Sequence, residues 1–244
     1  MAIRVLGIIT ARGGSKGIPR KNLVSLLGKP LLAYTAEAAL ASKKLTRTVL
    51  STDDAEIATI GRQWGIDVPF FRPAELARDD TPTIPVLQDV VGRLESMGER
   101  YDAILTLQPT NPLRQPEDID GAIDLLERTG ADSVISFSDV GERHPARMKW
   151  IDEEGRVSDP PFAEEFEGKP RQLLSKLYLR DGSIYLTRRT VLMEQNSLKG
   201  ADCRAWIIPE ERSRNIDSPL DLLIVEQILR SHTKAEACVP GPRE

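Results

Sequence analysis

Apolar runs alternate with amphipathic segments along the first 140 residues of the chain. IRVLGIIT at residues 3–10 predicts a buried strand, and KPLLAYTAEAALA at 29–41 has apolar residues at helical spacing, with Pro30 near the helix start. TRTVLST at 46–52 predicts a second strand. The following DDAEIATIGRQW, at 53–64, predicts a helix in which Asp53 is the N-cap and Glu56 completes a capping box.

The alternation continues with further strands and helices. DVPFF (67–71), YDAILTLQ (101–108) and ADSVISF (131–137) predict strands, and TIPVLQDVVGRLES (83–96) and PEDIDGAIDLLERTG (116–130) predict the helices between them. Strands that alternate with helices require crossover connections, which join parallel strands. The pattern therefore predicts an α/β fold of the Rossmann-like type, a mainly parallel twisted sheet with helices on both faces.

The pattern breaks between residues 139 and 181, where Gly, Pro and charged residues dominate and MKWIDEEGRV (148–157) predicts a hairpin. Strands at 182–189 and 203–210 and a closing helix from Ser218 then complete the fold. We expect residues 1–138 and 182–232 to form the α/β domain and 139–181 to be an insertion. The last residues, 233–244, lack periodicity and are expected to form a mobile tail.

Charge and composition exclude several classes of protein. The net charge of the 244 residues is −4, which gives no general affinity for nucleic acid or an anionic membrane. Two cysteines and two histidines are too few for a disulfide framework or a histidine and cysteine metal cluster. No apolar run has the length of a membrane span, and the N-terminus has no long apolar core typical of a signal peptide. We expect a cytoplasmic protein that binds neither membrane nor nucleic acid.

The loop ARGGSKGIPRKN, residues 11–22, is a local exception to this acidic balance. It follows the first strand and combines three glycines with Arg12, Lys16, Arg20 and Lys21. Glycines let backbone N–H groups approach an anion, and the cations compensate phosphate oxygens. The spacing matches neither GxxxxGK[ST] nor GxGxxG, which disfavours a P-loop enzyme and a dehydrogenase. A polyphosphate site or a solvated basic loop remain the alternatives.

Several stretches of the chain follow one another in the order found in a known family. They are RGGSKGIPRKNL (12–23), STDD (51–54), RPAELARDDT (72–81), LQPTNPLR (107–114), GSIYLT (182–187) and NIDSPLDL (215–222). Together they resemble the sugar-activating cytidylyltransferases, in particular the acylneuraminate (CMP-sialic acid) synthetases, over most of residues 3–230. A shared order of blocks is far more specific than one glycine-rich loop.

The resemblance implies that the first loop wraps the triphosphate of CTP. Arg12, Ser15, Lys16 and Lys21 would bind phosphates, and Asn22 would lie close to the nucleoside. Cations fixed beside the α-phosphate stabilise the charge that builds up in the transition state more than that of the ground state. Arg12 and Lys16 are therefore expected to act in catalysis.

Two further residues match nucleotide-binding positions of the family. Arg72 corresponds to an arginine beside the cytosine, and Thr83 to a hydroxyl residue that helps to hold the nucleotide. The alternatives are that Arg72 is a surface residue and that Thr83 caps the next helix.

The resemblance also implies where the acceptor sugar binds. Gln108 would contact the sugar, and Arg171, with a basic residue near 144–149, would approach its carboxylate across a dimer interface. Arg114 has two open interpretations, a bidentate partner of a sugar carboxylate or a structural salt bridge. The sequence departs from the family at Asp181-Gly182, where Asn-Gly is expected, which leaves the acceptor contacts open.

The metal position differs most clearly from the family pattern. Many relatives have Asp-x-Asp before the last helix, where this chain has Asn215-Ile216-Asp217. Mg²⁺ takes one or two carboxylates together with phosphate oxygens and waters. Asp217, which would also act in catalysis, and with it Asn215, are therefore the expected Mg²⁺ ligands. The alternative is that Asp217 caps the closing helix, a position that Ser218 already suits.

These implications define an expected reaction. The enzyme would transfer CMP from CTP to the anomeric hydroxyl of a 2-keto-3-deoxy sugar acid, a nonulosonic acid such as N-acetylneuraminic, legionaminic or pseudaminic acid, and release pyrophosphate. One alternative is transfer to 3-deoxy-manno-octulosonic acid or another small acid such as a phosphonate. An alternative of another class is a non-catalytic nucleotide-binding regulator. The family also implies a homodimer formed through residues 139–181.

Overall fold

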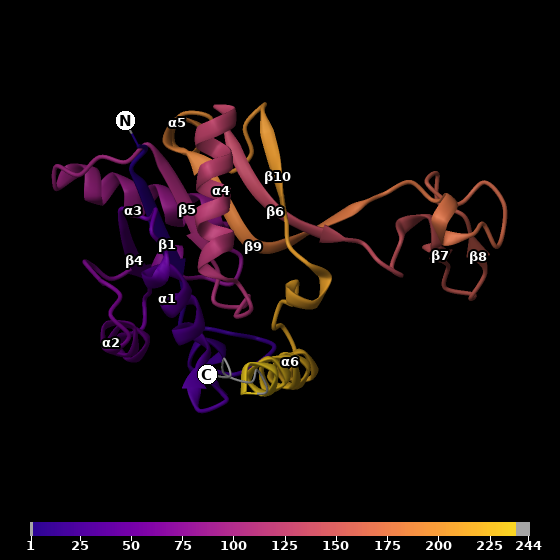
Figure 1. The fold of residues 1–244 in the computed structure, drawn as a ribbon, viewed down its shortest axis with the longest axis horizontal. Coiled ribbons are helices and arrows are strands. Elements are labelled where there is room, and N and C mark those ends of the chain that lie inside the picture. The colour runs from indigo at the N-terminus through magenta and orange to yellow at the C-terminus, as the bar shows by residue number, and fades with distance from the viewer. Residues whose placement is uncertain (1, 238–244) are drawn as a thin grey trace, which may run out of the picture.

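The fold is built on a six-stranded sheet, seen in a computed structural model that describes residues 2–237, with side chains described through Ser231 (Figure 1). The strand order is β10-β6-β9-β5-β1-β4. The strands are β1 (Val5–Thr10), β4 (Arg47–Ser51), β5 (Ala103–Leu107), β6 (Ser133–Asp139), β9 (Tyr178–Arg188) and β10 (Cys203–Ile207). Two short hairpins, β2 (Ser25–Leu26) with β3 (Lys29–Pro30) and β7 (Trp150–Ile151) with β8 (Val157–Ser158), lie outside this sheet.

The mainly parallel sheet expected from the sequence is confirmed, with one exception. β1 pairs in parallel with β4 and β5, and β10 pairs in parallel with β6. β9 runs antiparallel to both β5 and β6. Because of this reversal, the beginning of β9 lies at the same edge of the sheet as the carboxyl ends of β1, β5 and β6.

Helices cover both faces of the sheet. They are α1 (Leu31–Ala41), α2 (Ala55–Gln63), α3 (Thr83–Ser96), α4 (Pro116–Thr129), α5 (Arg189–Met193) and α6 (Pro219–Ala237). Short 3-10 turns occur at Lys21–Leu23, Ala74–Leu76, Pro145–Arg147, Arg171–Leu173 and Glu210–Arg212. No helix within residues 2–237 is both long and apolar enough to cross a membrane.

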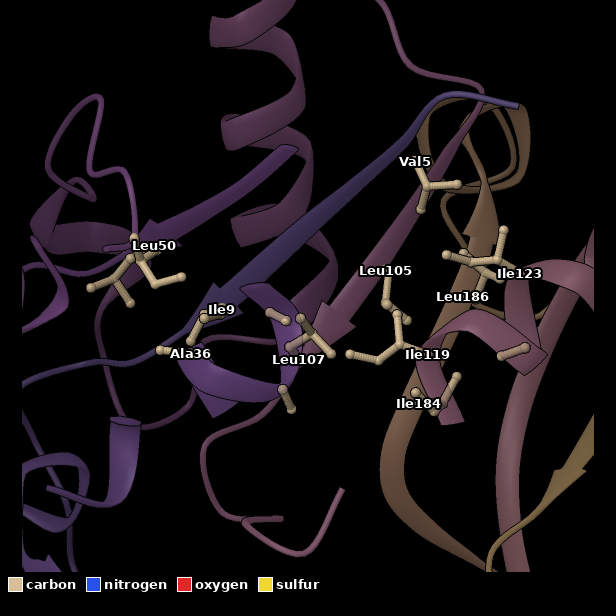
Figure 2. Packing of buried hydrophobic residues seen from close by; sticks show 14 of the residues in the cluster. Val5, Ile9, Ala36, Leu50, Leu105, Leu107, Ile119, Ile123, Ile184 and Leu186 are labelled. Carbon is tan, nitrogen blue, oxygen red and sulfur yellow. The ribbon is translucent and has the colours of Figure 1, made fainter. Parts of the chain in front are cut away.

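Alternate residues of β1 divide the core between the two faces. Val5 and Ile9 pack on the side of α1, α2 and α4, where Figure 2 shows Ile119 and Ile123 of α4 beside the strands. Leu6 and Ile8 pack on the opposite side, with α3 and α5. A smaller apolar cluster attaches α6 to the segments beside the first loop. Apolar burial on both faces thus holds the loops at the carboxyl edge in fixed positions.

Two local predictions were wrong by small margins. Asp54, and not Asp53, is the N-cap of α2, and its carboxylate accepts from the backbone N–H groups of Glu56 and Ile57. Asp53 instead accepts from the N–H of Gly13 at 2.9 Å. The stretch 67–71 forms no strand; it makes one isolated bridge between Asp67 and Val49.

Two other expectations concern the second half of the chain. The hairpin predicted around Gly155 is confirmed as β7–β8, with Gly155 at φ 79°. The expected tail from residue 233 is wrong in part, since α6 continues to Ala237, and residues 238–244 lie outside the described part of the chain.

An arm, defined as residues 140–177, projects from the sheet (Figure 1). It starts where β6 and β9 form a two-stranded ribbon that pairs as far as Asp139 and Tyr178, and it ends in the β7–β8 hairpin. Its apolar side chains are exposed at Met148, Trp150, Ile151, Val157, Phe162, Phe166, Leu173 and Leu177. An isolated monomer gains nothing from so much exposed apolar surface.

Candidate functional site

A cavity of about 560 Å³ opens at the carboxyl edge of the sheet. Four segments that are distant in the sequence form its walls: the loop after β1, the segment before α3, the loop after β5 and the segment before α6. The predicted residues Arg12, Ser15, Lys16, Lys21, Asn22, Arg72, Thr83, Gln108, Asn215 and Asp217 all line it. The structure therefore brings together every predicted site residue except Arg171.

The first loop is held in shape by close backbone contacts. A Cβ atom on Gly17 would lie 2.2 Å from the backbone oxygen of Asp217, so a side chain has no room there. The side-chain amide of Asn22, which is 8% exposed, donates to the backbone oxygen of Arg12 at 2.9 Å. These contacts fix the loop against the segment before α6, and they explain a glycine and an asparagine at these positions.

Two cations of the loop share one carboxylate. Arg12 Nη1 lies 2.9 Å from Asp79 Oδ1, and Lys16 Nζ lies 3.1 Å from Asp79 Oδ2. Arg12 also donates to the backbone oxygen of Arg78 at 2.8 Å. Lys16 and then Arg12 hold the pKa of Asp79 below its usual value. All three charged groups are accessible to solvent, so an anion with more charge than one carboxylate can displace Asp79.

A third cation of the loop contacts the segment before α6. Lys21 Nζ lies 2.8 Å from Asp217 Oδ1 and donates to the Ile216 backbone oxygen at 2.9 Å. Asn215 donates its amide N–H to Asp217 Oδ2 at 2.5 Å. The alternative role of Asp217 as a helix cap is wrong, because Ser218 and Asp221 form the reciprocal cap of α6.

Asp217 and Asn215 can hold a divalent metal only with help from a ligand. No group of three or more acidic, histidine or cysteine side chains suited to a metal occurs among the described residues. One carboxylate and one side-chain amide that line the same cavity do match the small number of protein ligands that Mg²⁺ uses when phosphates and waters complete its octahedron. The donor set therefore fits a metal that binds together with a nucleotide.

Arg72 is a buried guanidinium at the inner end of the cavity. It is 8% exposed, and it donates to Ser51 Oγ at 3.0 Å and to the Ser51 backbone oxygen at 2.7 Å. Burial lowers the pKa of Arg72 to about 10, so it stays charged at neutral pH. The alternative of a surface arginine is wrong. The helix-cap alternative for Thr83 is wrong too, since Pro82 occupies the N-cap of α3.

The loop after β5 is fastened from inside by Arg114 and Asn111. Arg114 donates to the backbone oxygens of Ser183 at 2.6 Å and Gln108 at 2.9 Å, and to Thr35 Oγ1 at 3.2 Å. Asn111 donates to the backbone oxygen of Asp181 at 2.9 Å. Both earlier interpretations of Arg114 are wrong, because its side chain does not line the cavity and its hydrogen bonds go only to neutral oxygens.

A second cavity of about 640 Å³ lies beside the first, at the base of the arm. Charged side chains dominate its lining, with Arg143, Arg171, Arg180 and Arg214 facing Asp139, Glu142, Asp181, Glu210 and Asp221. Asn215 lines both cavities, so the two adjoin at this residue. Arg171 thus lies near the predicted site, in the adjoining cavity rather than in the cavity of the first loop.

His144 has a structural role at the base of the arm. Its Nδ1 accepts from the backbone N–H of Ala146 at 3.1 Å, and its Nε2 lies 3.0 Å from the backbone oxygen of Ser175. Both ring nitrogens are engaged, and the side chain is 8% exposed. This arrangement joins the two ends of the arm and leaves no ring nitrogen for proton transfer.

The sequence did not predict the contacts of Asp79 and Arg114. The Asp79 carboxylate contacts both Arg12 and Lys16. Its block, RPAELARDDT, carries the acidic pair after the arginine, which was the available signal. The sequence around Arg114 gives no indication of its hydrogen-bond partners, because Thr35 and Ser183 lie 79 and 69 residues away.

The protein family that matches the chain and three similar relatives have names that refer to CMP or to cytidylyl transfer. The family model described as cytidylyltransferase matches residues 6–199. The CMP-N,N'-diacetyllegionaminic acid synthase of Legionella pneumophila is 33% identical over 234 residues, covering 96% of this chain and 99% of the relative. The pseudaminic acid cytidylyltransferase of Campylobacter jejuni is 31% identical and is covered to 92%. The chain spans half the length of the 32% identical N-acylneuraminate cytidylyltransferase A of Danio rerio.

Two solved structures share the fold at low sequence identity. CMP:2-keto-3-deoxy-manno-octonic acid synthetase complexed with CTP superposes with a TM-score of 0.71 at 17% identity, covering 94% of this chain and 99% of the other. The 4-diphosphocytidyl-2C-methyl-D-erythritol synthase of Anaerococcus prevotii gives a TM-score of 0.63 at 14% identity. Both likenesses extend over nearly the whole chain.

Proposed function

Because this chain belongs to the cytidylyltransferase family, and is therefore a nucleotidyltransferase, we propose that it transfers CMP from CTP to the anomeric hydroxyl of a nonulosonic acid and releases pyrophosphate. The observation that carries the proposal is the meeting of Arg12, Lys16 and Lys21 with the buried Arg72 in one cavity. Three cations at its mouth suit a triphosphate, and a buried guanidinium suits the polar edge of a base.

The nucleotide is assigned to the first cavity. Arg12, Ser15, Lys16 and Lys21 bind the phosphates, and Asn22 keeps the loop in the shape that receives them. Arg72 has one guanidinium edge occupied by Ser51, and it turns the remainder toward the cytosine. Thr83, the first residue of α3, lies beside the base.

The acceptor is assigned to the space between Gln108 and the second cavity. A sugar acid offers one carboxylate and several hydroxyl groups. Arg171 and its neighbouring guanidinium groups suit the carboxylate, and the acidic side chains of the same cavity suit the hydroxyl groups. Because the two cavities adjoin at Asn215, an acceptor in the second reaches a nucleotide in the first.

The reaction requires few protein groups beyond those that bind and orient. Attack forms a bond from the anomeric oxygen to the α-phosphorus and breaks the bond between that phosphorus and the bridging oxygen of pyrophosphate, and the anomeric hydroxyl releases its proton to water. Arg12 and Lys16 stabilise the negative charge that builds up on the transferred group and the leaving pyrophosphate. Mg²⁺ held by Asp217 and Asn215 would neutralise phosphate charge and help to align the reactants.

The arm supports a proposal of a homodimer. Ile151 is 70% exposed and Trp150 is 57% exposed, and they lie on a hairpin distant from the body of the fold (Figure 1). Residues 139–181 therefore form the dimerisation segment, and a second copy of the chain covers these side chains. The base of the same arm carries Arg171, so dimer formation and the acceptor site are close in space.

Two substitutions test the assignment of the site. Lys16→Ala and Asp217→Ala are each expected to lower the turnover number at least tenfold, measured as pyrophosphate release from CTP with a panel of sugar acids. Lys199→Ala is the matched control, because Lys199 is exposed and lines neither cavity.

The outcomes separate the proposed site from the proposed reaction. Near wild-type turnover of both variants at saturating CTP would contradict the site. Tight CTP binding without pyrophosphate release from any acid would instead favour a nucleotide-binding regulator. Release with 3-deoxy-manno-octulosonic acid alone would change the acceptor but not the reaction class.

A further inference from the structure

Arg114 is a buried cation that forms no salt bridge among the described residues, although the carboxylates of Asp181 and Asp118 stabilise its charge at longer range. Its side chain is 4% exposed, and its guanidinium donates to Ser183 O, Gln108 O and Thr35 Oγ1. No carboxylate within the described part of the chain forms an ion pair with it. Burying a charge is costly, and neutral oxygens offset the cost only in part. A leucine or methionine would fill the same volume without that cost, so the guanidinium has a use other than filling space.

The partners of Arg114 explain that use. On one side, Gln108 lines the first cavity and is followed by Pro109 and Thr110, which line it as well. On the other side, Ser183 lies two residues after Asp181, which lines the second cavity. Arg114 is thus hydrogen-bonded at once to the wall of the nucleotide cavity and to the segment that forms the wall of the adjoining one.

The segment around Ser183 needs such a partner because β9 is irregular there. The register between β6 and β9 shifts between Ile135 and Phe137, and Gly182 has φ 86°. This irregularity takes the carbonyl groups of Asp181 and Ser183 out of regular pairing, and buried carbonyl groups must find other donors. Asn111 supplies one donor and Arg114 supplies the other.

The hydroxyl groups of two serines complete the support. Ser136 donates to Asp181 Oδ1 and accepts from the N–H of Ile184 at 2.8 Å, and Ser183 Oγ donates to Asp181 Oδ2 at 2.7 Å. The Asp181 carboxylate is thereby fixed at the wall of the second cavity. Its place relative to Gln108 depends on Arg114 and Asn111, the two side chains that cross between the loop after β5 and the start of β9.

We propose that Arg114 is a positioning residue for the transfer reaction, which sets the separation and angle between the nucleotide-bearing and acceptor-bearing walls without touching either substrate. The inference rests on the proposed function of the two cavities. A guanidinium suits this position because Nε, Nη1 and Nη2 are separate atoms that each reach a different oxygen, whereas all three donors of an ammonium group diverge from one nitrogen. In-line attack is sensitive to displacements of about 1 Å, so this separation matters for rate.

Arg114→Lys is the first test. The variant keeps a cation but cannot hold all three oxygens, so the turnover number is expected to fall about 100-fold. The dissociation constant for CTP with Mg²⁺, measured by calorimetry, is expected to stay within about threefold, since Arg72 and the first loop are unchanged. Arg114→Met, which fills the space without charge, is expected to fold and to lose at least as much turnover.

Hydrogen exchange provides a readout that needs no acceptor. In Arg114→Lys, the backbone amides of residues 108–114 and 181–184 are expected to exchange faster, while those of β1 and β4 keep their protection. Arg188→Met is the matched control, because Arg188 donates to the Ala131 backbone oxygen at 2.8 Å at the opposite end of β9. This control is expected to leave turnover and the exchange of both segments unchanged.

The results can contradict the inference in two ways. Turnover of Arg114→Lys within threefold of wild type, or faster exchange spread evenly over the sheet, would show that Arg114 only contributes to overall stability. Absence of pyrophosphate release by the wild-type protein with every sugar acid would instead contradict the proposed function. The exchange and CTP-binding measurements would still test what Arg114 holds.

Discussion

Gly17 limits the shape of the site at the scale of one residue. An alanine at this position would place its Cβ 2.2 Å from the Asp217 backbone oxygen, so the first loop or the segment before α6 must move. Gly17→Ala is therefore expected to lower the turnover number by about 100-fold, because displacement by about 1 Å is enough for such a loss. Pyrophosphate release measures the effect. Gly92→Ala, in α3 and outside the lining of the cavity, is the control, because an added Cβ there meets nothing within 4 Å.

The Asp79 carboxylate forms ion pairs with Arg12 and Lys16, the two cations that are proposed to bind the phosphates. Asp79→Asn removes the charge that pairs with Arg12 and Lys16, and is expected to tighten CTP binding about two- to fivefold at low salt, since exposed pairs contribute little. The gain is expected to shrink as ionic strength rises. Calorimetry at two salt concentrations measures both effects, and weaker binding of CTP by the variant would contradict the proposed competition.

At the scale of residues, the sequence predicted those site residues that lie next to one another in the chain. Arg12, Lys16 and Lys21 belong to one loop, and their charge and glycines indicated an anion site before any fold was known. The contacts of Asp79 and Arg114 were not predicted, because they depend on partners that only the folded chain brings near. Local composition carries no information on such pairs.

The N-terminus of α2 is joined to the first loop by an ion pair between Asp54 and Arg20. Arg20 donates to Asp54, the α2 N-cap, and is the main cause of the lowered pKa of Asp54. A carboxylate with a lowered pKa stabilises the folded state above its ordinary pKa of 3.8, and this contribution is lost as pH falls through the folded-state value.

Asp54→Ala is therefore expected to reduce the free energy of unfolding by about 1 kcal/mol at pH 7, the usual effect of losing an N-cap. The difference from wild type is expected to shrink as pH falls below about 4. Thermal unfolding of both proteins between pH 7 and pH 3 measures it. A difference that stays constant over this range would contradict the role of the charge.

At the scale of elements, most strands and helices followed from periodicity, and the exceptions have physical reasons. The stretch 67–71 has strand composition, but it lies after the edge strand β4 and finds only the single bridge at Val49. The direction of β9 was not predictable, because an apolar run is the same read in either orientation. The arm before β9 decides it, since β6 continues into the arm and β9 returns from it.

At the scale of the whole molecule, the arm is expected to set the oligomeric state. Trp150→Asp is expected to convert the proposed dimer to a monomer, because a charge in an apolar interface has no partner there. Sedimentation velocity measures the change. Met97→Asp is the control, since Met97 is 63% exposed and lies after α3 on the body of the fold. A variant that stays dimeric would contradict an interface through the hairpin.

The antiparallel strand in the middle of the sheet has a consequence for the order in which the nascent chain can fold. β5 pairs with residues of β9 such as Arg188, which leaves the ribosome 85 residues later than its partner Ala103. Until then, β1, β4 and β5 can associate, but one edge of β5 stays open, and so do both edges of β6, whose neighbours β9 and β10 come later in the chain. An open apolar strand edge is where chains pair with one another incorrectly. Truncated chains that end within the arm are therefore expected to aggregate, and prompt completion of translation protects this protein.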